Sequence, residues 1–468
     1  MDAKMSHQIS DPASSCRNAG RSAGRKTQRG WALLAALAIL LAGLSTPVLS
    51  QVSPATTPSP VEAYYVPLPE TDLLGSFQAI AIPTAEAEAP IDTLISIAIA
   101  VDNTIIWYDH WEDGYEADVR TSAQDSTEIW GDGDLDNGAA PGVTTDADDV
   151  LQGGIPVVLE NTVALPRSAA VLRYDGRDKI QASFPIAVTR SAYPVTPGSV
   201  LAGAVEVLST ESRSWATDFA VPVGPSTPNL SGTDPFEYST LYIMAQRADT
   251  QVFLNSVSQG TLGEGENLTL AVDQGDRLTS SKPVQVSLVT GDVDSRYEMR
   301  WYTLSAIGCC GNDYYTPVGE SNGPTQVWIY NVASDPITVS YDFEGGATPD
   351  GTIGPIATGA VALSPVVPNG SGARFWTLDG APFVALSQTD TDGGPFASGS
   401  VSDWGFPLLV SNTLSNQVLV GQGRGNTSND SSIASRSVVW VVPIAPAVIY
   451  VDYDSDGTVD NTYRFSEN

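Results

Sequence analysis

Short runs of alternating apolar and polar residues make up most of the chain after residue 62. These runs are rich in Val, Ile, Thr and aromatic residues, and clusters of Gly, Pro, Asp and Asn separate them. A half-buried strand has this two-residue period, and no stretch keeps the 3.6-residue period of a capped amphipathic helix. The pattern therefore predicts an all-β protein.

Two sequence elements recur along the chain. The first is an alternating strand, a turn rich in Asp, Asn or Ser, and a second alternating strand, and it occurs at residues 93–108, 240–255, 325–341 and 407–421. The second contains a proline, and it occurs at residues 178–191, 276–291 and 373–388. The prolines of this second element, Pro185, Pro283 and Pro382, lie 98 and 99 residues apart. Proline suits the first residue of a strand, where its missing N–H removes no ladder bond. We interpret the pattern as one supersecondary unit used three times, with a fourth begun.

This spacing predicts repeated β-sandwich-like modules of immunoglobulin size, and a propeller-like arrangement is the alternative. The predicted modules cover residues 63–235, 236–320 and 321–403, with a partial fourth module at 404–468. The first module carries a long acidic insertion at about residues 109–152.

The first fifty residues have the layout of a secretory signal. Six basic residues precede the apolar run WALLAALAILLAGL at residues 31–44, and small residues follow near Ser50. The run is shorter than the roughly 20 residues that a membrane span needs. We expect cleavage near Ser50, with an uncleaved N-terminal anchor as the alternative, and no further membrane span. Residues 51–62 are rich in Ser, Thr and Pro and predict a linker.

Removal of this leader leaves 16 basic and 52 acidic residues, a net charge of about −36. Such a chain repels nucleic acid and anionic lipid and attracts cations. It keeps two cysteines, Cys309 and Cys310, so it has no disulfide framework and its stability must come from packed cores. The adjacent pair could be free thiols or a strained vicinal disulfide. We expect a rigid turn between Gly308 and Gly311 rather than a redox site.

Two acidic stretches resemble calcium loops. In DYDSDGTVD the acids Asp452, Asp454, Asp456 and Asp460 surround Gly457, which matches the first half of an EF-hand loop. The twelfth position is Tyr463 rather than Glu, so we expect a β-associated calcium loop, or a solvated acidic turn. In WGDGDLDNG the acids Asp132, Asp134 and Asp136 alternate in the same way, but the glycine is displaced by one position.

The stretch IIWYDHWEDGYE, residues 105–116, is the most chemically dense part of the chain. A glycoside hydrolase could use two of its carboxylates, Asp109, Glu112, Asp113 and Glu116, with Trp111 and Tyr115 as sugar platforms. The same acids could help to bind a cation. The third interpretation, which we favour, is a structural transition from strand to loop with packed aromatic residues and solvated acids, in which the strand end delivers acids to a cation-organised loop.

Other enzyme classes have little support. His110 is the only histidine after the leader, so one chain cannot assemble a histidine-based metal cluster. A Ser-His-Asp triad would have to use it, and the chain has no G-x-S-x-G elbow. It also has no P-loop and no dinucleotide-binding fingerprint.

Three stretches, YDHWEDGYEADV, WGDGDLDNG and LRYDGRDKIQASFPIAVTRSAYPVTPGSVLAGAVEV, resemble a group of uncharacterised bacterial secreted or surface proteins with many modules. This resemblance covers most of residues 90–460. The stretches DRLTSSKPVQVSLVTGD and SWATDFAVPVGP also resemble, more distantly, the N-terminal domain of the IgG-Fc-binding protein family. Neither resemblance implies an activity or a set of catalytic residues. Because members of the bacterial group continue past such a terminal loop, this chain is expected to be either shorter than its pattern implies or a fragment.

The sequence thus predicts an exported, acidic, calcium-stabilised protein that binds an extracellular glycan or protein, or has a structural role at the cell surface. It is expected not to be an enzyme. A carboxylate-dependent glycan hydrolase centred on residues 109–116 is the alternative.

Overall fold

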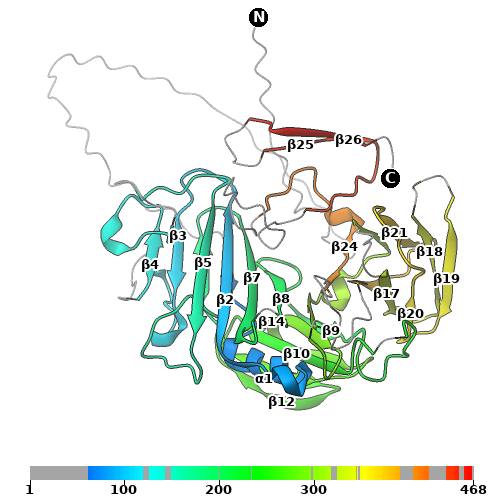
Figure 1. The fold of residues 1–468 in the computed structure, drawn as a ribbon, viewed down its shortest axis with the longest axis horizontal. Coiled ribbons are helices and arrows are strands. Elements are labelled where there is room, and N and C mark those ends of the chain that lie inside the picture. The colour runs from blue at the N-terminus through cyan, green and yellow to red at the C-terminus, as the bar shows by residue number, and fades with distance from the viewer. Residues whose placement is uncertain are drawn as a thin grey trace, which may run out of the picture. The chain divides into compact units, whose positions relative to one another are not determined.

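The computed structural model describes residues 62–119, 126–142, 149–198, 200–232, 234–296, 299–317, 324–343, 345, 348–389, 404–420, 439–452 and 458–465. These residues all belong to one contact unit, Thr57–Asn468. The predicted signal segment lies outside the described residues, as does the predicted linker up to residue 61. The described part consists mostly of antiparallel strands, which confirms the predicted β character (Figure 1).

The strands fall into three groups along the chain. The first group has β1 (Glu62–Tyr65), β2 (Glu88–Ile99), β3 (Ile106–Asp109), β4 (Glu128–Trp130), β5 (Pro156–Val163), β6 (Lys179–Ala182), β7 (Ile186–Thr196) and β8 (Gly203–Val207). The second has β9 (Ala216–Ala220), β10 (Tyr238–Ala245), β11 (Thr250–Leu254), β12 (Val257–Leu262), β13 (Asn267–Ala271), β14 (Arg277–Gly291) and β15 (Met299–Thr303). The third has β16 (Asp313–Thr316), β17 (Thr325–Asn331), β18 (Ile337–Asp342), β19 (Gly351–Ile356), β20 (Val361–Leu363), β21 (Ala373–Thr377), β22 (Phe383–Thr389) and β23 (Trp404–Pro407).

The same order of strand pairing occurs in all three groups. In the first group the sheets are β1-β6-β3-β4 and β5-β2-β7-β8, and Figure 1 shows β5, β2 and β7 side by side. In the third group β16-β21-β18-β19 and β20-β17-β22-β23 repeat this order, and β24 (Leu409–Val410) adds to the edge at β16. In the second group the single strand β14 takes the places of both β6 and β7, so all the strands join one sheet.

The three recurring prolines mark the same point in each group. Pro185 directly precedes β7 and Pro382 directly precedes β22, as the sequence predicts. Pro283 instead lies inside β14, where the partner strand changes. Up to Ser280 this strand pairs with β11, and from Val284 it pairs with β10. The proline at this change of partner therefore removes no ladder bond to either strand.

Side chains from both sheets of a group share one core. In the first group, Ile97 of β2, Tyr108 of β3 and Val188 of β7 belong to one buried cluster. In the third group, Ile329 of β17 and Phe375 of β21 do the same. The elements predicted at residues 93–108 and 325–341 are not hairpins, because the two strands of each element lie in different sheets. The immunoglobulin-like and propeller-like arrangements stay predictions, as do the module boundaries.

The predicted fourth repeat at residues 407–421 has a different structure. Its beginning forms the end of β23 and the short strand β24, both of which pair with strands of the third group. The 3₁₀ helix η6 (Ser411–Thr413) follows, and residues 414–420 form no strand. Val418 and Val420 keep the apolar alternation typical of a strand, but both are exposed and belong to no sheet in the described part of the chain. Farther on, β25 (Ala447–Val451) and β26 (Asn461–Phe465) pair with each other.

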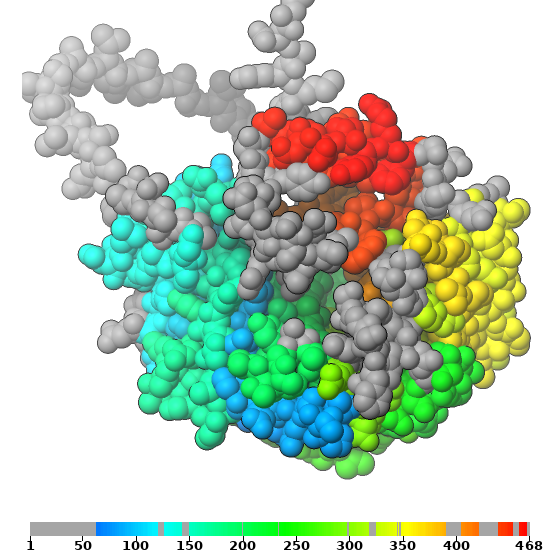
Figure 2. All heavy atoms as spheres, viewed as in Figure 1, coloured from blue at the N-terminus to red at the C-terminus, as the bar shows by residue number. Residues whose placement is uncertain are grey.

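One α-helix, α1 (Glu70–Ile80), occurs in the described residues, although the sequence pattern predicts none. Pro69 occupies the N-cap position without a side-chain hydrogen bond, and Leu73, Phe77 and Ile80 form a buried stripe with a spacing of three to four residues. This face packs against strands of the first two groups, and Figure 2 shows the helix (blue) at the surface beside the second group (green). Eleven residues were too few for a sustained helical period.

Candidate functional site

The first strand group has longer connections than the second at two equivalent places. Residues 110–127 join β3 to β4, whereas Asn255 and Ser256 alone join β11 to β12 in a turn with positive φ angles of 51° and 66°. Residues 131–155 join β4 to β5, whereas residues 263–266 join β12 to β13. The added chain corresponds to the predicted acidic insertion, and its first part leads into the candidate site.

Residues 108–112 contact a second segment, residues 167–178, which comes just before β6. The Tyr108 hydroxyl donates to Oδ2 of Asp178 at 2.7 Å. The backbone N–H of Trp111 donates to Oδ1 of the same carboxylate at 3.4 Å, and its indole N–H donates to Oδ1 of Asp175 at 3.0 Å. Because β3 and β6 are neighbours in one sheet, strand pairing brings the two segments together.

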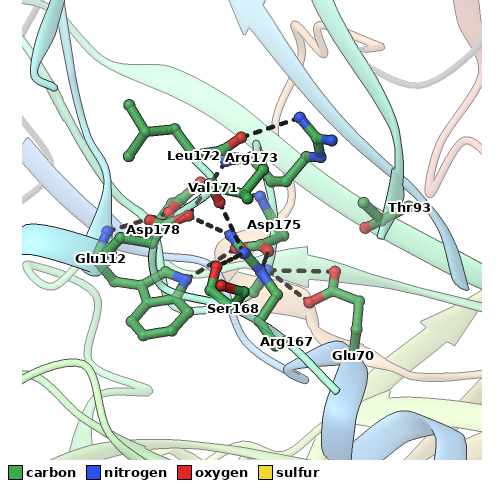
Figure 3. A network of polar contacts seen from close by, with 12 residues as sticks. Glu70, Thr93, Glu112, Arg167, Ser168, Val171, Leu172, Arg173, Asp175 and Asp178 are labelled. Atoms are coloured by element: carbon green, nitrogen blue, oxygen red, sulfur yellow. Dashed lines mark hydrogen bonds and ion pairs between the residues drawn. The ribbon is translucent and has the colours of Figure 1, made fainter. Parts of the chain in front are cut away.

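Arg167 holds two buried carboxylates. Its guanidinium forms ion pairs with Oε1 of Glu112 and Oδ2 of Asp175, and Figure 3 shows Arg167 between these two residues. Both acidic side chains are only 1% exposed. Oε1 of Glu112 also accepts from the backbone N–H of Arg173 at 3.2 Å, whereas Oε2 is buried and has no hydrogen-bond partner. The cluster has more carboxylates than nearby guanidinium groups.

His110 lies beside this pair of carboxylates and is buried. Its Nδ1 is 3.0 Å from the carbonyl oxygen of Arg173 and 3.7 Å from Oδ2 of Asp178. Its Nε2 is 3.5 Å from Oε1 of Glu128. Burial favours the neutral form of Glu128, but contacts from His110, Tyr174 and Trp130 outweigh it and lower the pKa of this carboxyl.

His110, Glu112 and Asp178 each place a potential ligand atom within 4.8 Å of the other two. This is the one such group of His, Cys, Asp and Glu side chains in the described part of the chain. The sequence excludes only metal clusters built from several histidines, which one chain with a single histidine after the leader cannot assemble. A mixed set of one imidazole and two carboxylates, however, needs only this histidine.

The structure places the predicted ligands Asp132, Asp134 and Asp136 on an exposed loop. Their carboxylates accept local hydrogen bonds. Oδ1 of Asp132 accepts the N–H of Asp134 at 2.9 Å, and Oδ1 of Asp134 accepts the N–H of Asp136 at 3.0 Å. Asp149, which is buried, accepts from the N–H groups of Gly131 and Asp132 at 2.6 and 3.1 Å. These acids form a turn that is stabilised by local hydrogen bonds. Calcium binding to this turn stays a prediction.

The second predicted calcium loop joins β25 to β26. Asp452 directly follows β25 and Asp460 directly precedes β26, where its N–H donates to the carbonyl of Val451 at 2.9 Å. Asp454 and Asp456 lie outside the described residues. The loop is thus flanked by strands, and its calcium ligands stay a prediction.

The expectation that the acids at 109–116 are solvated is wrong for Asp109, Glu112 and Glu116, whose side chains are buried, and holds only for the exposed Asp113. Asp109 is fully buried, and burial, reinforced by the adjacent Glu116 carboxyl and partly opposed by Lys179, raises its pKa to about 9. Asp113 accepts from the Ser126 hydroxyl. Glu116 accepts from the hydroxyl of Thr127.

The two aromatic residues that could serve as sugar platforms, Trp111 and Tyr115, are half-buried and contact other side chains. The guanidinium of Arg177 lies 4.3 Å from the ring centre of Trp111. The Tyr115 hydroxyl donates to the carbonyl of Arg177 at 2.7 Å, and its ring packs edge-on against Tyr65. A cavity of about 200 Å³ next to Tyr242 and another of about 500 Å³ next to Arg296 lie elsewhere.

Sequence reasoning missed Arg167, Asp175, Asp178 and Glu128 as members of this cluster. They lie far from His110 in the sequence, and only the pairing of β3 with β4 and β6 brings them together. The one available signal was the density of charge in LRYDGRDK, residues 172–179, directly before a predicted strand.

Comparison with protein-family models and with curated proteins finds no match to this chain. Among the described residues, no helix is both long and apolar enough to cross a membrane.

Proposed function

We propose that this chain is an exported, non-enzymatic protein built from sandwich-like β modules, which binds an extracellular glycan or protein and is stabilised by calcium. The burial and internal bonding of the carboxylates at 109–116 carry the non-enzymatic part of this proposal. A glycoside hydrolase needs an acid and a second carboxylate that both reach the scissile bond of the sugar. Asp109 and Glu112 instead have buried side chains that contact other residues of the first strand group.

A row of aromatic side chains offers a binding surface. The rings of Trp404 and Phe406 on β23 stack with centres 5.6 Å apart and planes 5° apart. Trp440 continues the row, with its ring centre 6.3 Å from that of Trp404, and this residue is 47% exposed. Flat aromatic faces of this kind pack against the apolar faces of sugar rings as well as against protein side chains. The strongly acidic chain disfavours nucleic acid as the partner.

The test combines binding and turnover on the same purified chain. A panel of bacterial and host polysaccharides is assayed for co-sedimentation and for release of reducing ends. The proposal expects binding without turnover, and Trp440→Ala should weaken it at least tenfold. Leu378→Ala, which removes an isolated apolar side chain that is 85% exposed, is the matched control and should change nothing. Reducing ends that disappear in Glu112→Gln would instead establish the hydrolase alternative.

A further inference from the structure

We propose that His110, Glu112 and Asp178 bind a divalent transition-metal ion of the zinc class, at a site separate from the predicted calcium loops. Their potential ligand atoms lie within 4.8 Å of one another, and His110 and Asp178 are buried. Oε2 of Glu112 is a buried carboxylate oxygen without a hydrogen-bond partner, on a side chain that is 1% exposed. Such an oxygen is costly to bury unless a proton donor or a cation meets it.

The two ring nitrogens of His110 face different groups. A proton on Nε2 suits the carboxylate of Glu128 at 3.5 Å. The other nitrogen, Nδ1, then directs a lone pair toward two oxygens, the Arg173 carbonyl at 3.0 Å and Oδ2 of Asp178 at 3.7 Å. A proton on Nδ1 would donate to the Arg173 carbonyl, whereas a metal ion at Nδ1 would meet this lone pair together with the Asp178 carboxylate, whose Oδ2 also accepts from the Tyr108 hydroxyl. A carboxylate on the far nitrogen of a metal-binding histidine is the usual outer-shell partner, which orients the ring.

The charges of the cluster also favour a divalent ion. Glu112, Asp175 and Asp178 contribute three carboxylates, and Arg167 contributes one guanidinium that pairs with the first two. Glu128 adds a fourth carboxylate beside His110, so the carboxylates outnumber the guanidinium and a divalent cation would offset part of the excess negative charge. Burying uncompensated charge costs several kcal/mol per ion, so this balance matters more here than on an exposed loop.

The ligand types select the class of metal. Calcium and magnesium prefer sites made of oxygen ligands, whereas an imidazole nitrogen suits zinc and its neighbours. Because the site is buried and supplies protein ligands from two segments, the ion would have a structural role. It would link the segment after β3 to the segment before β6, and the three side chains would leave a fourth coordination position to another ligand.

The test measures zinc on the purified full chain, produced without a histidine tag. We expect close to one zinc per chain after dialysis by elemental analysis, and a higher melting temperature with zinc than after chelation. Cobalt(II) in place of zinc should give visible d–d absorption bands. His110→Gln and Glu112→Gln should each weaken zinc binding at least tenfold. Glu128→Gln, which removes only the outer-shell carboxylate, should weaken it by about 10–100-fold.

Asp134→Asn is the matched control, because it removes an exposed acid of the predicted calcium loop and should leave zinc affinity unchanged. Folded protein that takes up no zinc overturns the proposal. Zinc binding that survives His110→Gln and Glu112→Gln with unchanged affinity also overturns it, since the ion must then bind elsewhere. Neither result depends on glycan binding or on calcium, so this proposal and the proposed function fail separately.

Discussion

Glu70 and Arg190 form a buried ion pair in which Nη2 of the arginine lies 2.6 Å from Oε1 of the glutamate. The two side chains are 3% and 0% exposed. Arg190 also donates to the hydroxyl of Thr93 at 2.6 Å, and Oε2 of Glu70 accepts from the N–H of Gly176 at 3.1 Å. The pair therefore links the first turn of α1 to β7, to β2 and to the segment that carries the candidate metal site.

Removing one partner of this pair should be costly. Glu70→Gln leaves a buried guanidinium without its counter-charge, and we expect the free energy of unfolding to fall by about 3–5 kcal/mol. Urea denaturation of the full chain measures this. Arg277→Met is the control, because the Arg277–Asp218 pair is 61% and 38% exposed and should contribute under about 1 kcal/mol. Equal small losses in both variants would contradict the assignment.

Two glycines allow the strand groups to pack against each other. A Cβ atom on Gly203 of β8 would lie 2.1 Å from the ring of Trp301 on β15. A Cβ atom on Gly405 of β23 would lie 2.4 Å from the hydroxyl of Tyr302, the next residue of β15. β15 thus contacts strands of both other groups, and any side chain at either glycine would push them apart.

We therefore expect Gly203→Ala to destabilise the protein by about 1–3 kcal/mol through overpacking. Gly75→Ala is the matched control. Gly75 lies inside α1, nothing lies within 4 Å of the position of its Cβ, and alanine there should stabilise the helix by about 0.5–1 kcal/mol. Thermal unfolding of both variants checks the opposite signs, and a Gly203→Ala protein as stable as the parent would refute the packing.

The repeat could be predicted from the sequence because strand alternation and recurring prolines are local signals. Pro185 and Pro382 precede strands as predicted, since the rule depends only on the missing N–H of proline. The continuous strand through Pro283 could not be predicted, because it depends on which strands lie on either side. The helix α1 was missed for a different reason: its apolar stripe of Leu73, Phe77 and Ile80 spans too few turns to outweigh the surrounding β pattern.

The candidate site could be predicted only in part. The density of charge around His110 marked one half of it, and the sequence interpretation of a strand end that leads into a loop matches β3 and the 3₁₀ helix η3 (Trp111–Asp113). The other half, Asp178 with Arg167, approaches through sheet pairing of β3 with β6. Contacts between segments this far apart in sequence depend on the fold as a whole, and local residue patterns do not encode them.

The two cysteines provide a test of local burial. Cys309 and Cys310 are both free thiols, and η5 (Ile307–Cys309) ends within the pair. Burial, with a smaller effect from its neighbour, raises the pKa of the Cys310 thiol to about 12, and burial also raises the pKa of Cys309. Because the thiolate is the reactive form, alkylation of the native protein at pH 8 should be slow.

Mass spectrometry after iodoacetamide treatment should show Cys309 modified before Cys310. The rate at Cys310 should rise about tenfold for each pH unit below its pKa, as the thiolate fraction does. Unfolded protein in urea is the control and should react quickly at both positions. A disulfide between the two residues in freshly purified protein would contradict the free-thiol structure.

Calcium binding at the 132–136 loop can be separated from the zinc proposal by the choice of ion. Oδ1 of Asp149 is buried without a hydrogen-bond partner next to this loop, and the closely spaced Asp132, Asp134 and Asp136 repel one another without a cation. With zinc excluded, calcium at about 100 times its dissociation constant should stabilise the fold by about 2.7 kcal/mol. Thermal unfolding in calcium and in chelator measures this gain.

Asp132→Asn and Asp134→Asn should each remove most of it if this loop binds the ion. If the gain instead disappears in Asp454→Asn and Asp456→Asn, the ion binds between β25 and β26. An unchanged melting temperature across millimolar calcium would mean that both stretches are solvated turns.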